Sequence, residues 1–369
     1  MNLRALGHRL IQPIVRRWQA PPIGVDFAGE RLNMLQMAAG AGAPVVRAAI
    51  SIPYPGPREA LLGDARALKK FVRGALSSAP FLGRRIYSAL PACDVRLVPL
   101  SVQVAAGQTE QQAVAKAARA HLGTAVNGAV IDYYRTHGEG EGPERQVLVA
   151  LAEEQKVLAY LAMLCRAGFD TAALEIAPTA IARLLAALHQ EDREQSILLI
   201  NFGVSKSFFT MIWGGRLMLD REIEFGEIQL ADKLAKSLGL EQDMALALLR
   251  EHGIGGVTRA QPVYGAAQLD VGQTIREILH PELALLAEEL SRTRVYVASR
   301  THGTAVSRIY LNGGAAHYLN IEATLGELVA LPLELLKPFA AFAAAPANAA
   351  VEHSIALAAG LALRGSCHG

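Results

Sequence analysis

The sequence predicts an α/β protein of two lobes that share a repeated strand–turn–strand unit. Residues 23–28 form an apolar strand that ends in an aspartate, an aromatic residue and a small residue. Residues 198–203 repeat this order with an asparagine in place of the aspartate, and a second apolar strand follows each copy, at 32–37 and 208–213. Recurrence at a separation of about 175 residues is typical of a duplicated domain. Chance similarity between two β-hairpins is the alternative explanation.

Length and composition fit a folded protein with two or three packed units. The chain has 369 residues, of which 51% are hydrophobic and 19% are charged. Its net charge of +2 predicts no strong polyanionic partner, which argues against nucleic acid. Cys93, Cys165 and Cys367 are far apart and lack CxxC spacing, which is typical of a reducing compartment. Residues 338–351 are uncharged but too short to span a bilayer.

Residues 1–20 differ from the rest of the chain in charge. Arg4, Arg9, Arg16 and Arg17 occur among apolar residues, and no acidic residue is present. The segment lacks the continuous apolar core and small-residue cleavage site of a secretory signal. One interpretation is a basic amphipathic tail that contacts an anionic membrane surface, although Pro13 interrupts the helical pattern. The other is a frayed terminus.

The first half of the chain alternates strand and helix patterns. Strands are expected where short apolar runs lie between turn residues, and helices where apolar residues such as Leu68 and Val72 recur at helical spacing. Thr109 is a suitable N-cap for a helix that Gly123 ends, and Gly168 ends the next helix. The predicted strands are 23–27, 32–37, 45–50, 85–90, 95–104, 129–135, 145–152 and 174–176, and the predicted helices are 65–76, 109–121, 154–166 and 178–189.

The second half opens with the repeated hairpin and then becomes mostly helical. Gly214 and Gly215 are expected to join two of its strands, and Gly253 to end a helix. Pro281 lies in the first third of a long helical pattern, which leaves open whether this region is one helix or two. The predicted strands are 198–202, 208–213, 216–221 and 307–311, and the predicted helices are 226–238, 241–252, 274–301 and 354–363.

Three turns follow buried strands and consist of small residues, at 26–29, 201–205 and 312–316, the last of which is expected to open a helix. Such turns can direct several backbone N–H groups at an anion, and a following helix adds its dipole. Other chemistries have little support. The chain has no Walker phosphate loop, no HExxH zinc motif and no GxSxG nucleophile, and its histidines lack ligand spacing.

Seven short segments, in this order, resemble the PilM family and, more distantly, FtsA in the actin superfamily. Residues 24–33 read GVDFAGERLN, which is similar to the family's opening VGLDIGSSSVK. Residues 311–315 read LNGGA, which resembles the family's LxGGgA turn, and 356–365 read ALAAGLALRG, similar to its final helix. The other segments are SALP at 88–91, VLVALA at 147–152, residues 160–168 and APTA at 177–180.

The resemblance implies an actin-like (ribonuclease H-like, duplicated) two-lobed fold around a cleft, with a smaller subdomain inserted in each lobe. The first lobe body would be 21–93 with 174–195, and its inserted subdomain 94–173. The second lobe body would be 196–225 with 300–369, and its inserted subdomain 226–299.

The resemblance also implies a role in type IV pilus assembly or a related secretion system. Members of the family are cytoplasmic scaffolds, peripheral at the inner membrane, that bind the cytoplasmic tail of a bitopic PilN-like protein and contact other platform components. The tail is expected in a groove of the first lobe beside its inserted subdomain. Two alternatives remain: an active ATPase or sugar-kinase-like phosphotransferase with Asp26 as its base, and a filament-forming cytoskeletal protein.

ATP with magnesium is the cofactor that the superfamily implies, but the matching turns depart from the pattern. Ala28, Glu30 and Arg31 replace a glycine and small hydroxyl residues, and a carboxylate close to a triphosphate is repelled. Leu246 and Leu249 fall where polar residues would contact ribose. The expectation is therefore a scaffold with a degenerate or regulatory nucleotide cleft and no catalytic residue. The candidate nucleotide-binding residues are Asp26, Gly29, Asn33, Asn201, Gly203, Ser205, Ser207, Gly226, Asn312, Gly313, Gly314 and Ala315.

Overall fold

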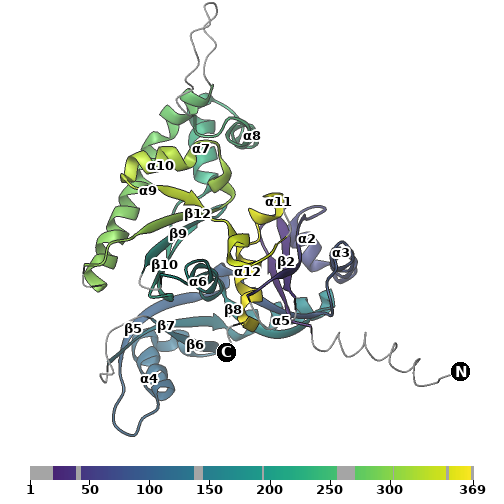
Figure 1. The fold of residues 1–369 in the computed structure, drawn as a ribbon, viewed down its shortest axis with the longest axis vertical. Helices are drawn as coiled ribbons and strands as arrows, with labels where there is room; N and C mark the ends of the chain where they lie inside the picture. Colours follow the sequence, from purple (N-terminus) through teal and green to yellow (C-terminus); the bar gives the residue numbers. More distant parts are fainter. Residues whose placement is uncertain are drawn as a thin grey trace, which may run out of the picture. The chain divides into compact units, whose positions relative to one another are not determined.

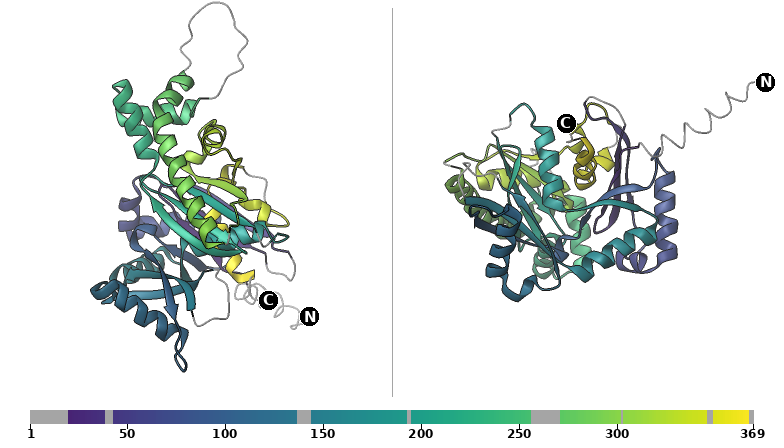
Figure 2. Two further views of the ribbon diagram at one scale, coloured as in Figure 1. Left: turned by 90° about the vertical axis from the view of Figure 1, so that its left-hand side faces the viewer. Right: turned by 90° about the horizontal axis from the view of Figure 1, so that it is seen from below.

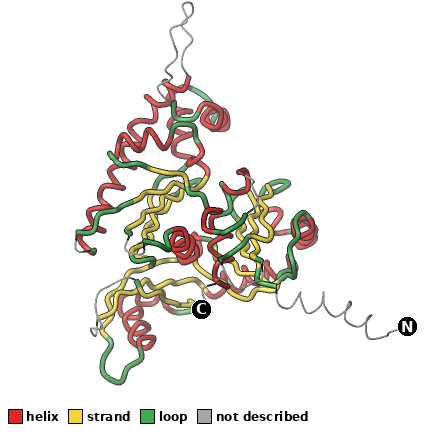
Figure 3. Tube along the Cα trace, viewed as in Figure 1, coloured by secondary structure: helices red, strands yellow, loops and turns green. Residues whose placement is uncertain are grey.

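The computed structural model describes residues 20–38, 43–136, 144–192, 195–255, 271–301, 303–345 and 349–366. Apart from Ala20, the basic tail proposed for residues 1–20 lies outside the described residues. The chain divides into two compact units, each containing strands and helices (Figures 1 and 3). The first unit includes residues up to Glu191, Gly215–Leu217 and residues from Lys337 onward, and the second includes Asp192–Gly214 and Met218–Leu336.

The first unit contains a five-stranded sheet in the order β3-β2-β1-β4-β8. Strand β1 is antiparallel to β2 and parallel to β4, and β4 is parallel to β8. The buried side chains of β1 explain its position at the centre of the sheet. The strands are β1 (Ile23–Phe27), β2 (Arg31–Met37), β3 (Val46–Pro53), β4 (Arg85–Leu90) and β8 (Asp170–Ile176).

The second unit repeats this sheet in the order β11-β10-β9-β12-β13. Strand β9 is antiparallel to β10 and parallel to β12, and β12 is parallel to β13. Asp26 pairs with Asn33 in the first hairpin, and Asn201 pairs with Phe208 at the same register in the second. The predicted duplication is confirmed. The strands are β9 (Ser196–Phe202), β10 (Ser207–Trp213), β11 (Arg216–Ile223), β12 (Arg308–Gly313) and β13 (Leu333–Leu335).

A separate three-stranded sheet, in the order β5-β7-β6, is inserted in the chain between β4 and β8. It consists of β5 (Arg96–Gln103), β6 (Ala129–Arg135) and β7 (Glu144–Glu153), and helix α4 (Glu110–Leu122) packs on it through Val114 and Ala118. Thr109 and Gln112 form a capping box at the start of α4, and Gly123 caps its end. The predicted caps of this helix are confirmed.

The remaining helices of the first unit cover its five-stranded sheet. Leu68 and Val72 of α3 and Leu164 of α5 are buried with the side chains of β1. Gly24 of β1 lies against α12, where an added Cβ would stand 2.1 Å from the carbonyl oxygen of Ala358. The helices are α2 (Arg58–Gly63), α3 (Ala65–Ser77), α5 (Glu154–Ala167), α6 (Ala177–Leu188), α11 (Ala349–Glu352) and α12 (Ala356–Ala362).

Four helices pack with the sheet of the second unit: α7 (Glu227–Leu238), α8 (Gln242–His252), α9 (Val271–Arg300) and α10 (Ile321–Val329). Helix α9 is continuous through Pro281, so the alternative of two helices is wrong (Figures 1 and 2). Pro281 is exposed, whereas Leu279 and Leu283 beside it are fully buried. Burial of this apolar stripe offsets the backbone hydrogen bond that proline removes.

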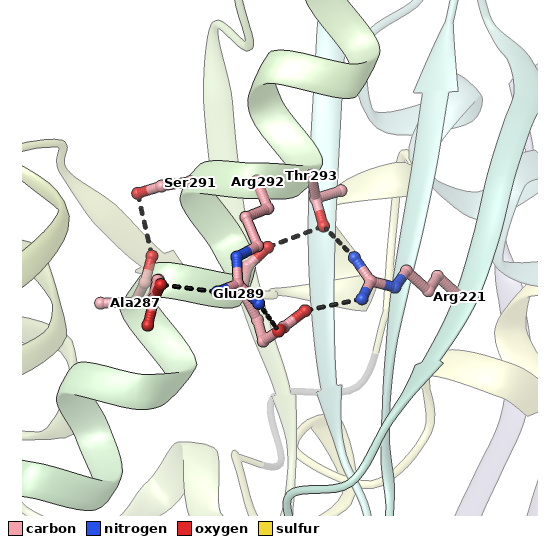
Figure 4. Close-up of polar contacts among 7 residues, drawn as sticks. Arg221, Ala287, Glu289, Ser291, Arg292 and Thr293 are labelled. Atoms are coloured by element: carbon pink, nitrogen blue, oxygen red, sulfur yellow. Dashed lines mark hydrogen bonds and ion pairs between the residues drawn. The ribbon is translucent and has the colours of Figure 1, made fainter.

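A charged network connects α9 to β11 (Figure 4). Arg221 of β11 donates to Oε2 of Glu289 at 2.6 Å and to the hydroxyl of Thr293 at 3.3 Å. Arg292 donates to Oε1 of the same glutamate at 2.8 Å and to Glu288 at 2.6 Å. Glu289 therefore accepts hydrogen bonds from two arginines, one on the sheet and one on its own helix.

Several short elements differ from the sequence-based expectation. The glycine turn after β12 opens one turn of 3-10 helix, η3 (Gly314–His317), and the α-helix that follows, α10, begins only at Ile321. Helices α2 and α11 and strand β13 were not predicted. The other 3-10 turns are η1 (Ala92–Asp94), η2 (Gly123–Val126), η4 (Pro338–Ala341) and η5 (Leu363–Ser366). Each helix in the described ranges is too short or too polar to cross a bilayer.

Candidate functional site

The turn between β1 and β2, which we call the first turn, is held by a chain of side-chain hydrogen bonds. Asn33 Nδ2 donates to Oδ2 of Asp26 at 3.0 Å, and Ser51 Oγ donates to Oδ1 of Asn33 at 2.7 Å. Arg31 Nε donates to Oγ of Ser51 at 2.8 Å. Two of the predicted site residues, Asp26 and Asn33, are therefore in direct contact. Arg31 is thus bonded to β3.

The carbonyl oxygens of the first turn accept hydrogen bonds from a neighbouring segment. Tyr54 donates its hydroxyl to the oxygen of Ala28 at 3.0 Å. Arg58 donates from Nε to the same oxygen at 3.1 Å and from a terminal nitrogen to the oxygen of Phe27 at 3.3 Å. Gly29 lies at the exposed bend that follows. These contacts hold the carbonyl oxygens at the end of β1.

Burial raises the pKa of the Asp26 carboxyl to about 6, although the Asn33 hydrogen bond and the Arg58 charge both act to lower it. Burial also raises the pKa of the nearby Tyr160 hydroxyl to about 12. Tyr160 lies 3.2 Å from Oγ of Ser88, which donates to the carbonyl oxygen of Val25 at 2.9 Å. Asp26, Tyr160 and Ser88 therefore form a polar cluster at β1, and Arg58 is the positive charge that acts on it.

The corresponding turn between β9 and β10, which we call the second turn, is held by hydrogen bonds of the Ser207 hydroxyl to nearby backbone groups. Ser207 donates its hydroxyl to the carbonyl oxygen of Phe225 at 2.6 Å and accepts the N–H of Gly203 at 3.3 Å. Ser205 is exposed. A Cβ on Gly203 would lie 2.1 Å from the carbonyl oxygen of Lys206, which explains the glycine. The hydroxyl of Ser207 thus both donates and accepts a hydrogen bond within the protein.

The N-terminus of α7 lies against the second turn. The N–H groups of Glu227 and Ile228 donate to the carbonyl oxygens of Gly203 and Val204, at 3.2 and 2.9 Å. A Cβ on Gly226 would lie 2.6 Å from the Val204 oxygen. Helix N-termini commonly bind anions through such N–H groups, but these two already bind the turn.

Asn201 and Asn312 meet where β9 and β12 run side by side. The two residues are register partners, and Nδ2 of Asn312 donates to Oδ1 of Asn201 at 2.7 Å. The asparagine that replaces the expected aspartate therefore has a partner within the unit. This contact joins two predicted site residues that are far apart in the sequence.

The glycines after Asn312 are explained by close packing. Gly313 has a φ of +93°, and a Cβ there would lie 2.0 Å from the carbonyl oxygen of Phe202. A Cβ on Gly314 would lie 2.3 Å from Oε1 of Glu227, and the buried Tyr318 hydroxyl is 3.2 Å from that oxygen. Burial and the Glu227 charge raise the pKa of Tyr318. Ala315 is fully buried.

The two leucines that replace ribose-contacting residues belong to the hydrophobic core. Leu249 is fully buried, and the partly buried Leu246 packs against the same cluster. Among the predicted residues, Asp26, Gly29 and Asn33 lie in the first unit and the others in the second. Arg58 and Glu227 were missed. A glutamate directly after the helix-opening Gly226 was a weak signal, whereas Arg58 gave none.

Within the described residues, no group of three or more His, Cys, Asp or Glu side chains is arranged to hold a metal ion. The side chains of Asp26, Ser207 and Asn201 are each hydrogen-bonded within their own unit.

Comparison with known proteins gives one family. The profile described as "Type IV pilus assembly protein PilM" matches residues 24–261. A solved "PilM-PilN type IV pilus biogenesis complex" is 22% identical, with a TM-score of 0.75 over 94% of this chain and 99% of that chain. The ethanolamine utilization protein EutJ from Carboxydothermus hydrogenoformans is 13% identical, with a TM-score of 0.52 over 94% and 91% of the two chains. These likenesses show the actin-like fold that the sequence predicts.

Proposed function

The chain belongs to the PilM family of type IV pilus assembly proteins, and we propose that it is a cytoplasmic adaptor that binds the tail of a PilN-like membrane protein. In this role it would be peripheral at the inner membrane and would connect that tail to other components of the pilus platform. The observation that carries the proposal is the family match, which covers both copies of the duplicated hairpin.

The geometry favours an adaptor over a phosphotransferase. Asp26, the base required by the alternative enzyme, accepts a hydrogen bond from Asn33 and is close to the charge of Arg58. Ser207 and the first N–H groups of α7 are bonded within the second unit. A nucleotide would have to break these contacts, each worth about 0.5–1.5 kcal/mol. Tail binding without nucleotide is therefore the expected behaviour, with a degenerate or regulatory nucleotide site as part of the proposal.

We place the tail on the first unit, beside the sheet β5-β7-β6. Helix α5 contacts β6 and β7 in this region. Leu158 of α5 is 57% exposed and Val130 of β6 is 45% exposed, so each offers an apolar side chain to a partner. Contiguous exposed apolar surface is typical of protein-binding sites, and we propose that these two side chains contribute to one.

The test is a binding titration of the full chain with a labelled N-terminal peptide of a PilN-like protein. Fluorescence anisotropy should give saturable binding that is the same with and without magnesium-ATP. Leu158→Glu should weaken it about tenfold or more if this surface is used. Leu285→Glu, at a residue 59% exposed on α9 of the second unit, is the matched control. Binding that requires magnesium-ATP, or no binding to several tail peptides, would contradict the proposal.

A further inference from the structure

Two carbonyl oxygens at the first turn accept hydrogen bonds from one guanidinium group. Arg58 donates to the carbonyl oxygens of Phe27 and Ala28, and its charge acts on the carboxyl of Asp26. A third Arg58 nitrogen lies 3.7 Å from Oε1 of Glu59, whose side chain is 82% exposed. Two carbonyl oxygens and the Glu59 carboxylate are therefore close to this single cation, and its charge also acts on the Asp26 carboxyl.

Carbonyl and carboxylate oxygens are also the ligands that hard cations such as Mg²⁺ take in proteins. Asp26 and Phe27 are the last two residues of the buried strand β1, and Ala28 follows directly, so the strand fixes the positions of these oxygens. Arg58 comes from outside the hairpin, 30 residues beyond Ala28, at the first residue of α2. A metal ion brought by a ligand would have to displace it or share its oxygens.

We propose that Arg58 is the resident counter-ion of the first turn and stands in for a ligand-bound metal ion. The first turn is then ordered without any ligand, and the same side chain fastens α2 to the end of β1. The hydroxyl of Tyr54 supports this arrangement by donating to the Ala28 oxygen. The proposal concerns the first unit alone and holds whether or not the chain binds a PilN-like tail.

The experiment compares melting temperatures of the full chain and its Arg58→Ala variant in buffer, magnesium chloride, magnesium-ATP and millimolar guanidinium chloride. The wild-type Tm should be the same in buffer, magnesium chloride and magnesium-ATP. Arg58→Ala should lower the Tm by about 4–8 °C, because a charge-assisted set of hydrogen bonds is lost. Magnesium or guanidinium should recover part of that loss by binding the vacated oxygens.

Arg47→Ala is the matched control. Arg47 also donates from Nε to a backbone carbonyl oxygen, that of Pro80 at 2.9 Å, but it is exposed on β3. Its variant should not be rescued by either cation. Should Arg58→Ala fail to fold, Arg58→Lys keeps the positive charge, whereas Arg58→Met keeps only a long side chain. We expect Arg58→Lys to keep most of the wild-type Tm and Arg58→Met to lose it.

Three results would overturn the proposal. The first is a wild-type Tm that rises with the magnesium-ATP concentration and no longer rises in the Arg58 variant, which would make Arg58 a phosphate ligand. The second is an Arg58→Ala protein as stable as wild type. The third is a destabilised variant that neither cation restores, which would reduce Arg58 to a packing role. The anisotropy titration with the tail peptide, run on the same proteins, reports on the adaptor role separately.

Discussion

The side-chain amide of Asn312 donates a 2.7 Å hydrogen bond to Oδ1 of Asn201, joining the ends of two parallel strands. Both residues lie in the second unit and are partly exposed. Asn312→Ala leaves the Asn201 oxygen without this donor. The free energy of unfolding should fall by about 0.5–1.5 kcal/mol, measured by urea denaturation. Asn127→Ala, at an exposed residue after η2, should change it little. Equal effects of the two variants would show that the contact contributes nothing.

The two neighbouring glycines should respond differently to alanine. At Gly313 the clash is with the backbone of Phe202 and φ is positive, so Gly313→Ala should cost about 3–5 kcal/mol. At Gly314 the clash is with the end of the Glu227 side chain, which can move, so the cost should be about 1–2 kcal/mol.

The contact between Gly314 and Glu227 can be tested with a double-mutant cycle. Glu227→Ala removes the atoms that a methyl group at residue 314 would meet. The combined variant should therefore be destabilised by less than the sum of the single variants, by about 0.5–1.5 kcal/mol. Strict additivity in urea unfolding would mean that the two side chains do not meet in solution.

Stability should depend on pH through Asp220. Its carboxyl accepts a hydrogen bond from Thr210 at 2.6 Å, and burial raises its pKa from 3.8 to about 7. The folded chain therefore binds this proton more tightly than the unfolded chain, and the contribution of Asp220 to stability falls as the pH rises through this interval. Asp220→Asn keeps the acceptor for Thr210 but removes the ionisation.

The Asp220→Asn variant should be more stable than wild type by about 1–3 kcal/mol near pH 8, with little difference near pH 4. Urea denaturation across this range measures the effect. The same pH profile for both proteins would show that Asp220 has an ordinary pKa.

Glu175 holds the C-terminal segment of the first unit. Its buried carboxylate accepts a hydrogen bond from Arg183 at 2.9 Å and another from Arg364 of η5. Arg183 also donates to the carbonyl oxygen of Gly360 in α12 at 2.7 Å. Glu175→Gln should lower the free energy of unfolding by about 1.5–3 kcal/mol, because two cations lose their charged acceptor. Arg364→Ala should cost less, since this side chain is 40% exposed. The reverse order would contradict this assignment.

Local signals in the sequence were sufficient for most helices and strands. Thr109 and Gly123 gave both ends of α4, because capping residues act on the adjacent backbone. The repeat predicted the hairpin β1-β2 and its counterpart β9-β10, since strand pairing follows the hydrophobic pattern. Helix α2 and strand β13 were missed because they are too short to show a period. The single helix through Pro281 depends on tertiary burial, which outweighs the local preference of proline.

The contacts of the candidate site were less predictable than its residues. The pairing of Asp26 with Asn33 follows from the hairpin register. The contact of Asn201 with Asn312 depends on a parallel strand 111 residues later in the chain. The contact of Ala28 with Arg58 depends on the first residue of a helix 30 residues later. Sequence patterns report which positions are buried, but they do not report which distant side chain supplies a hydrogen bond.

The common register of the two hairpins has a consequence for the order in which the chain can form its contacts during synthesis. The acid at the end of β1 is bonded by a residue only 7 positions later, within its own hairpin. The equivalent residue of β9, Asn201, is paired with Phe208 in its own hairpin, and its side chain is bonded by Asn312 of β12. The N-terminal copy can therefore form this hydrogen bond while the ribosome is still translating, and its short loop also closes at low entropic cost. The C-terminal copy can form the Asn312–Asn201 bond only after β12 has been translated, when most of the polypeptide has emerged.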